Sequence, residues 1–168
     1  GIAILAREDT PSIDELVREV AQTEPAQPET CNDLEACIAR LRAIARTRSD
    51  GGGMGAQEDA VASRLQAMPG VVDAMVPLLA DTDVEVAELA AYVLRDVEAI
   101  DQRHLPAIRA GLDRDLGWLA PALARIGTDE AAEEAVKRLL AEYDAGNQEA
   151  YAVELFGERA IPMIINAA

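Results

Sequence analysis

The residue types that could support catalysis are few and scattered in this 168-residue chain. It has one histidine, His104, which stands beside Asp101 near a predicted helix start, where we expect an exposed or capping role. One imidazole is too little for a His-based metal site or a Ser-His-Asp relay. Acids outnumber bases 31 to 15, so carboxylate pairs arise by chance and do not indicate acid–base catalysis. We expect no enzyme here, with no catalytic residues, no metal and no cofactor.

Two further patterns could carry chemistry. Four glycines lie within Gly51–Gly55, but no strand precedes them and no Gly-Lys-Ser/Thr follows, so a tether or loop is favoured over a phosphate cradle. Cys31 and Cys37 flank a predicted helix start. Six helical residues rise about 9 Å, and a disulfide needs Cα atoms within about 7 Å. We therefore expect two reduced thiols in a cytoplasmic protein.

Composition and charge bound the fold and the partners. Half of the residues are apolar, 33 are alanine and only 3% are aromatic, which favours a closely packed all-helical chain. The net charge of −16 disfavours nucleic acid and anionic membrane surfaces as partners. No run of about 18 apolar residues predicts a membrane-spanning helix. The expected partner is another protein, with a basic one favoured by the charge.

The first part of the chain predicts two separate segments. A capping box at Ser12 followed by helical periodicity predicts a helix over 12–22, and a proline-containing linker follows, so 1–30 is an N-terminal helix and linker. Asn32 is the expected cap of the next helix. That helix carries a basic cluster, which either complements the helix dipole or docks an acidic partner. The cluster comprises Arg40, Arg42, Arg46 and Arg48. A helix with Val61 and Leu65 follows and ends at Pro69-Gly70.

From residue 71 the sequence repeats. Val76-Pro77, Leu105-Pro106 and Ile161-Pro162 begin similar segments, whose prolines are 29 and 56 residues apart. The proline-free middle copy falls at 134–136. Asp-rich turns at 81–83, 113–115 and 144–147 then predict capped second helices, ending near Val97, Gly127 and Gly157. A unit of about thirty residues with two antiparallel helices predicts an α-solenoid.

These residues resemble a known family. The stretch 78–94, with its Asp81-Thr82-Asp83 turn, looks like the core of a HEAT repeat of the short bacterial kind that also occurs in bilin lyases. The segments 123–127 and 155–162 resemble boundaries between such repeats. The likeness covers 31–168 as a HEAT-like helical repeat domain, most clearly over 71–168, and implies a curved superhelix that binds proteins. Ala87 departs from the pattern, because the family usually has Arg there, and this questions the interhelical Asp–Arg ladder.

The second helices suggest a binding row. Steps of 100° give three core faces. They contain Val86, Leu89, Ala90, Val93 and Val97; Leu116, Leu119, Leu123 and Ile126; and Ala152, Leu155 and Phe156. Three aromatic residues and four charged residues lie off these faces, on what would be the concave side of a solenoid. The seven candidates are Glu88, Tyr92, Arg95, Trp118, Arg125, Tyr151 and Glu154. The alternative is that the rings pack sideways against the next repeat.

Three functions remain open. The first is a non-catalytic scaffold or adaptor whose concave face binds another protein through Trp, Tyr and Arg. The second is an acidic inhibitor or immunity-type protein that blocks a basic enzyme such as a nuclease, because 71–101 holds eight acids and one base. The third is a bilin-lyase-like enzyme with Glu88, Tyr92 and Trp118 in a pigment groove. Three roles remain open for the C-terminal helix at 161–168: it caps the array, it is followed by more chain, or a second copy covers it in a homodimer.

Overall fold

The computed structural model describes residues 31–48, 52–141 and 147–167. The predicted helix over 12–22 and the linker after it lie outside these residues. The described residues form helices and short connections and contain no strand, which confirms the all-α prediction. None of their helices is long and apolar enough to cross a membrane.

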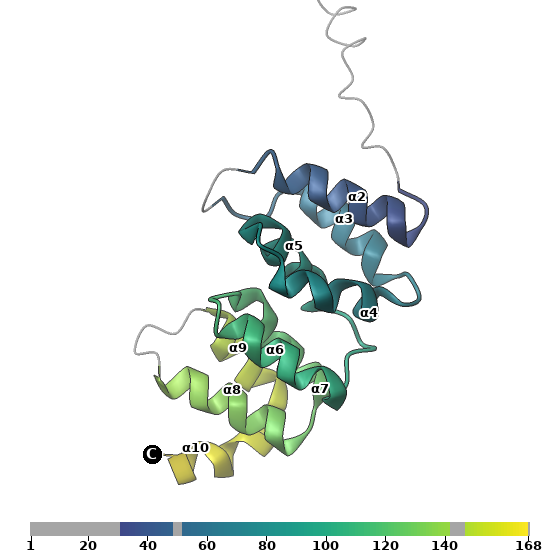
Figure 1. The fold of residues 1–168 in the computed structure, drawn as a ribbon. Helices are drawn as coiled ribbons and strands as arrows, with labels where there is room; N and C mark the ends of the chain where they lie inside the picture. Colours follow the sequence, from purple (N-terminus) through teal and green to yellow (C-terminus); the bar gives the residue numbers. More distant parts are fainter. Residues whose placement is uncertain (1–30, 49–51, 142–146, 168) are drawn as a thin grey trace, which may run out of the picture. The chain divides into compact units, whose positions relative to one another are not determined.

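The described residues form nine α-helices, which are labelled in Figure 1. They are α2 (Leu34–Ala45), α3 (Ala56–Gln66), α4 (Val71–Met75), α5 (Val84–Leu94), α6 (Leu105–Leu112), α7 (Ala120–Ile126), α8 (Asp129–Ala141), α9 (Asn147–Phe156) and α10 (Ile161–Ala167). Short 3₁₀ helices lie at Val76–Ala80, Gln102–His104, Gly117–Leu119 and Gly157–Ala160.

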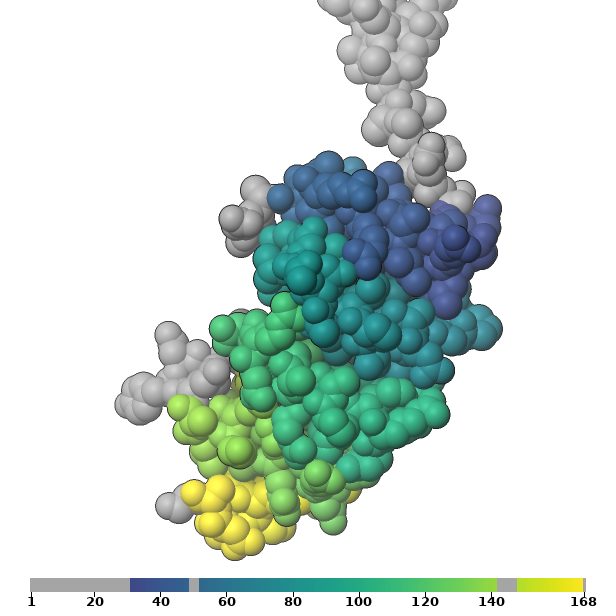
Figure 2. Space-filling view, in the orientation of Figure 1, coloured from purple at the N-terminus to yellow at the C-terminus, as the bar shows by residue number. Residues whose placement is uncertain are grey.

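Contacts join each helix to its neighbours in the chain order. Helix α2 packs on α3, and both contact α5. Helix α5 contacts the 3₁₀ helix Val76–Ala80 before it and the 3₁₀ helix Gly117–Leu119 after it. Helix α7 packs on α6, α8 and α9, while α10 contacts α8. The space-filling view shows the same succession, with the colour bands following one another from α2 to α10 (Figure 2).

Side chains and prolines define where the helices begin. The N-cap of α2 is Asp33, whose Oδ1 accepts a hydrogen bond from the Ala36 amide at 2.8 Å, so the prediction of Asn32 was off by one residue. Asp83 caps α5 as predicted, accepting from the Glu85 amide at 3.0 Å. Proline lies at the first positions of 76–80, α6 and α7, where its missing N–H costs no helical bond.

The second helix predicted between the 113–115 turn and Gly127 is shorter than expected. Asp115 has a φ of 63°, and Asp113 ends α6 instead of capping the next helix. Helix α7 begins only at Ala120, because Pro121 is tolerated in a first turn and would break a helix interior. The residues between form the 3₁₀ helix that carries Trp118. Helices α7 and α9 end before Gly127 and Gly157, as predicted, and both glycines have positive φ.

The core is built mainly from leucine, valine and alanine. The four predicted core positions of α5 are buried, as are Val97 just after it and Leu116, Leu119 and Leu123, whereas Ile126 is only partly buried. Ala87, at the position where HEAT repeats usually have Arg, is fully buried. On α9, Leu155 is 43% exposed, so its assignment to the core was wrong; Ala152 and Phe156 are buried as predicted.

Arginines connect helices that follow one another along the chain. Arg42 of α2 lies 2.9 Å from Asp81, and the largely buried Arg48 pairs with Glu58 and Glu85. These two members of the basic cluster therefore bind acids of the same chain. Arg114 donates to the carbonyl oxygen of Asp81 at 3.0 Å and to that of Leu79. Further on, Glu134 of α8 accepts from Arg109 of α6 at 2.9 Å and from Arg138 at 2.8 Å.

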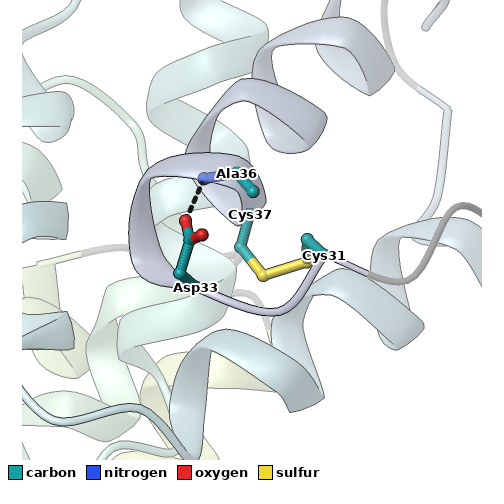
Figure 3. Close-up of a disulfide and its surroundings, with 4 residues drawn as sticks. All are labelled: Cys31, Asp33, Ala36 and Cys37. Atoms are coloured by element: carbon teal, nitrogen blue, oxygen red, sulfur yellow. Dashed lines mark hydrogen bonds between the residues drawn. A yellow bond between two sulfur atoms is a disulfide. The ribbon is translucent and has the colours of Figure 1, made fainter.

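The two cysteines form a disulfide, so the prediction of free thiols was wrong (Figure 3). Their Cα atoms are 4.9 Å apart. The helical-rise estimate fails because α2 begins only at Leu34. The chain before it is extended at Asp33, with φ −136° and ψ 169°, and it places Cys31 beside the first turn of the helix. The bridge ties the start of the described domain to the fully buried Cys37.

Candidate functional site

Tyr92, Arg95 and Trp118 form a compact group, which we call the aromatic cluster. The two rings meet edge to face, with centroids 5.0 Å apart and an interplanar angle of 82°. The Arg95 guanidinium carbon lies 4.8 Å from the Tyr92 centroid and 5.4 Å from that of Trp118. Tyr92 and Arg95 are three residues apart on α5 and so share a helix face. Trp118 reaches them from the 3₁₀ helix, across the junction between two helix pairs.

Carboxylates surround the aromatic cluster. Asp96 accepts from Arg95 Nε at 2.8 Å and lies 3.6 Å from the guanidinium of Arg125 on α7. Asp59 of α3 accepts a hydrogen bond from the Tyr92 hydroxyl. The cluster is therefore held from α3, α5 and α7 at once. Four of the seven predicted residues are brought together: Tyr92, Arg95, Trp118 and Arg125.

A polar hollow of about 350 Å³ opens beside the aromatic cluster. Its lining combines residues of α3 with residues of α5 and the turn after it: Asp59, Ala62, Ser63, Gln66, Tyr92, Arg95 and Asp96. A second hollow of about 520 Å³ shares Gln66 and Asp96 with it. Because donors and acceptors line the first hollow, it suits a polar or charged group better than an apolar one.

Two ionisable groups of α5 have shifted pKa values. Burial raises the pKa of Glu88, and the nearby Glu85 carboxylate raises it further. The pKa of Tyr92 is raised mainly because its hydroxyl donates to the Asp59 carboxylate, and burial adds to the effect. Tyr92 therefore remains a neutral donor. Glu88 lies one helical turn before Tyr92 and is half-buried.

Tyr151 and Glu154 lie apart from this group. Both are exposed on α9, and no described contact joins either of them to the aromatic cluster. A different residue of α9, Glu149, lies near the 3₁₀ helix that carries Trp118. A Cβ placed on Gly117 would be 3.9 Å from the Oε1 atom of Glu149. The predicted row of three rings is thus a pair with a separate third ring. Sequence reasoning did not place Asp59 or Asp96 in this site. Asp59 enters it because α3 packs on α5, and Asp96 enters it through its ion pairs with Arg95 and Arg125.

The remaining candidates for chemistry have local structural roles. His104 caps its own turn, with Nδ1 accepting from the Asp101 amide at 3.0 Å, and it is buried, so capping is confirmed and exposure was wrong. In the described part of the glycine-rich run, the carbonyl of Gly52 accepts from Arg48 at 2.9 Å. Within residues 31–48, 52–141 and 147–167, no group of three or more His, Cys, Asp or Glu could hold a metal ion.

Most of the acids of 71–101 are engaged within the protein. Asp81 pairs with Arg42 of α2, Glu85 pairs with Arg48 just after α2, and Asp96 lies between two arginines. Asp83 and Asp101 cap helical turns through backbone amides. The net charge of −7 in this segment is therefore offset in part by cations from other segments.

No protein-family model, curated protein or solved structure matches this chain. What the site does must therefore be argued from its own geometry.

Proposed function

We propose that the protein is a non-catalytic scaffold or adaptor, a HEAT-like α-solenoid whose second helices form a concave surface for another protein. The order of contacts supports this proposal, because each helix pair packs mainly on the pairs before and after it. The recurrence of proline at the start of 76–80, α6 and α10 supports it as well. Both features are typical of arrays in which a short unit repeats.

The aromatic cluster is the proposed centre of the binding surface. Trp, Tyr and Arg are the residue types that most often dominate interface energies, and they are most effective where surrounding groups exclude water. Here one residue of each type meets the other two, and Tyr92 and Arg95 also line a polar hollow. This single observation carries the proposal.

Packing between helices accounts for the buried parts of the aromatic cluster but not for the parts that stay exposed. Tyr92 and Trp118 lie against the core, yet neither is buried, and Arg95 keeps 26% of its side chain exposed. An edge-to-face pair contributes about 0.5–1.5 kcal/mol beyond its buried area. A guanidinium held over two rings at the surface also presents donors to a partner. The cluster can thus brace two helix pairs and still offer a preorganised surface.

The acidic-inhibitor hypothesis remains the second proposal. Asp73 and Glu98 favour it, since both line the larger hollow and are exposed, Asp73 with only a long 3.8 Å ion pair to Arg103. The ion pairs of Asp81, Glu85 and Asp96 favour the scaffold, because those carboxylates already have cations. Binding of a basic enzyme through this segment should weaken steeply between low and physiological salt. We place the bilin-lyase-like function third, and an absorption spectrum of the purified protein tests it.

The disulfide changes the cellular compartment that we propose for this protein. The cytoplasm was expected because the cysteines were taken as free thiols. A disulfide is typical of an oxidising compartment such as the periplasm or the cell exterior. We therefore propose a bacterial protein of such a compartment whose partner is a protein and neither nucleic acid nor membrane.

Affinity capture with variants tests the scaffold function. Immobilised wild type, Trp118→Ala and Val84→Thr are incubated with extract of the source cells, and the captured proteins are quantified by mass spectrometry. Val84 is 51% exposed and outside the aromatic cluster, so its variant is the matched control. We expect a protein retained by wild type and Val84→Thr and depleted at least tenfold by Trp118→Ala. Equal retention on all three, with Trp118→Ala folded by circular dichroism, contradicts the assignment.

A further inference from the structure

Two hollows that share a wall lie beside the aromatic cluster, and we call them the paired hollows. The smaller, of about 350 Å³, and the larger, of about 520 Å³, both include Gln66 and Asp96 in their linings. Gln66 ends α3, and its side-chain amide donates to the carbonyl oxygen of Val93 on α5 at 3.0 Å. A bond between two helices therefore fixes the shared wall. Each volume is typical of pockets that hold a ligand group.

Carboxylates outnumber cations in the lining of the paired hollows. The lining cations are Arg95, which is bound to Asp96, and Arg103, which lies 3.8 Å from Asp73. Asp59 and Glu98 are exposed, and neither forms an ion pair with any residue that the structure describes. The lining acids are Asp59, Asp73, Asp96 and Glu98. The paired hollows are therefore complementary to a positively charged group from another molecule.

The ends of two helices favour the same sign of charge. Helix α3 ends at Gln66 and α5 ends at Leu94, and the residues at and just after these ends line the paired hollows. The carbonyl groups at the C-terminal end of a helix carry a partial negative charge, which stabilises cations. This contribution comes from the backbone and is independent of the acidic side chains.

The lining also indicates which kind of cation fits. Over the described ranges, no three acidic, histidine or cysteine side chains come close enough to hold one metal ion, so the carboxylates act separately. The larger hollow combines its acids with the buried side chains of Val71, Val72 and Val97. An arginine side chain matches both parts of this lining. Its hydrocarbon stem packs on apolar surface, and its planar guanidinium donates to carboxylates.

We propose that the paired hollows bind a basic segment of the partner protein, with one arginine side chain in each hollow. This inference rests on the proposed scaffold function, because it names the chemistry recognised beside the aromatic cluster. In the larger hollow the guanidinium donates to Asp73 and Glu98. In the smaller hollow it donates to Asp59, which also accepts from the Tyr92 hydroxyl. Side chains two residues apart in an extended chain share a face, so the segment carries its arginines at i and i+2.

The probe for this site is the blocked peptide acetyl-Arg-Gly-Arg-amide. Its control has citrulline at both arginine positions, which keeps the shape of the side chain and removes its charge. Binding is followed at low salt on the full chain, labelled with ¹³C in the methionine methyl groups. Met68 lines the larger hollow and is the reporter. Met163 of α10 lies outside the paired hollows and is the internal reference.

We expect a saturable shift of the Met68 methyl with the arginine peptide, none with the citrulline peptide, and an unchanged Met163 methyl. The double variant Asp59→Asn, Glu98→Gln should raise the Kd of the arginine peptide at least fivefold. Asparagine at position 59 keeps an oxygen for the Tyr92 hydroxyl. The matched control, Glu35→Gln with Glu133→Gln, changes the net charge equally at exposed sites outside the hollows and should alter the Kd by less than about twofold.

Three outcomes with the peptides would overturn the inference. The first is the absence of a saturable Met68 shift. The second is equal binding of the citrulline peptide, which would show that the arginine charge is not recognised. The third is an equal loss of affinity in both double variants, which would show a general effect of net charge.

Capture of the partner separates this inference from the scaffold function. The protein retained by wild type and depleted by Trp118→Ala should also be depleted at least fivefold by Asp59→Asn, Glu98→Gln, and retained by Glu35→Gln, Glu133→Gln. Capture that depends on Trp118 but not on Asp59 and Glu98 would overturn the inference and leave the scaffold function standing. Capture that depends on Asp59 and Glu98 but not on Trp118 would support the basic segment and contradict the aromatic cluster as the centre of the surface.

Discussion

Reducing the Cys31–Cys37 disulfide should destabilise the domain measurably. The cross-link closes a loop with a sequence separation of 6. In the chain-entropy model, closing a loop of about six residues removes about 7 cal/mol/K from the unfolded chain, which is about 2 kcal/mol at 25 °C. Unfolding in urea, followed by far-ultraviolet circular dichroism with and without a phosphine reductant, measures the difference. With a slope of about 2 kcal/mol/M, the midpoint should fall by about 1 M.

The control for this experiment is a Cys31→Ser, Cys37→Ala variant, in which the reductant should have no effect. Alanine suits position 37 because the Cys37 side chain is fully buried and a hydroxyl there would lack a partner. Equal midpoints for the oxidised and reduced wild type would refute the entropic reasoning. Alkylation of two thiols in the native, unreduced protein would refute the disulfide itself.

Three further substitutions test the packing and electrostatics of the domain. Glu88→Gln should stabilise the fold at pH 7 and have little effect at pH 4. In the folded protein the pKa of Glu88 is raised above 4.5. The contribution of this group to wild-type stability is therefore fully present below pH 4.5 and is lost as the pH rises through the folded pKa. Thermal melts at the two pH values measure the gain, and an equal gain at both contradicts it. Gly111→Ala should lower stability by up to about 2 kcal/mol, because its Cβ would collide with the buried Leu119, at a cost of about 1–3 kcal/mol that helix propensity offsets by about 1; a higher urea midpoint would contradict this. Arg48→Met should lower the free energy of unfolding by about 2–4 kcal/mol, because it leaves the largely buried carboxylates of Glu58 and Glu85 without their cation. A decrease of less than about 0.5 kcal/mol in urea unfolding would show that these ion pairs do not stabilise the fold.

Local sequence signals predicted the all-helical class and several helix boundaries. Asp83 accepts an amide of the first turn whatever the rest of the chain does, so its cap on α5 could be inferred from neighbouring residues. Proline at the start of α6 and glycine after α7 act in the same local way. The 3.6-residue period placed Val86, Leu89 and Val93 in the core for the same reason.

The errors concern features that depend on distant or extended segments. The disulfide depends on the direction in which the chain enters α2, which no side-chain period encodes. The partners of Asp81 and Glu85 are Arg42 and Arg48, more than thirty residues earlier in the chain, so a local sum of charges overstated the net negative charge of 71–101. A row of three rings was predicted because each ring was placed on a second helix of a regular array. Helix α7 starts late at Ala120, and Trp118 therefore joins Tyr92 from a 3₁₀ turn.

The most direct test of the proposed function uses the only tryptophan of the chain. Replacing Trp118 with 5-fluorotryptophan gives a single ¹⁹F resonance at the aromatic cluster. The protein captured by wild type and depleted by Trp118→Ala is then titrated into the labelled chain. We predict that this resonance shifts or broadens until the partner saturates the site. An unchanged resonance at saturating partner would show that Trp118 only braces the two helix pairs, and would remove the aromatic cluster from the binding surface.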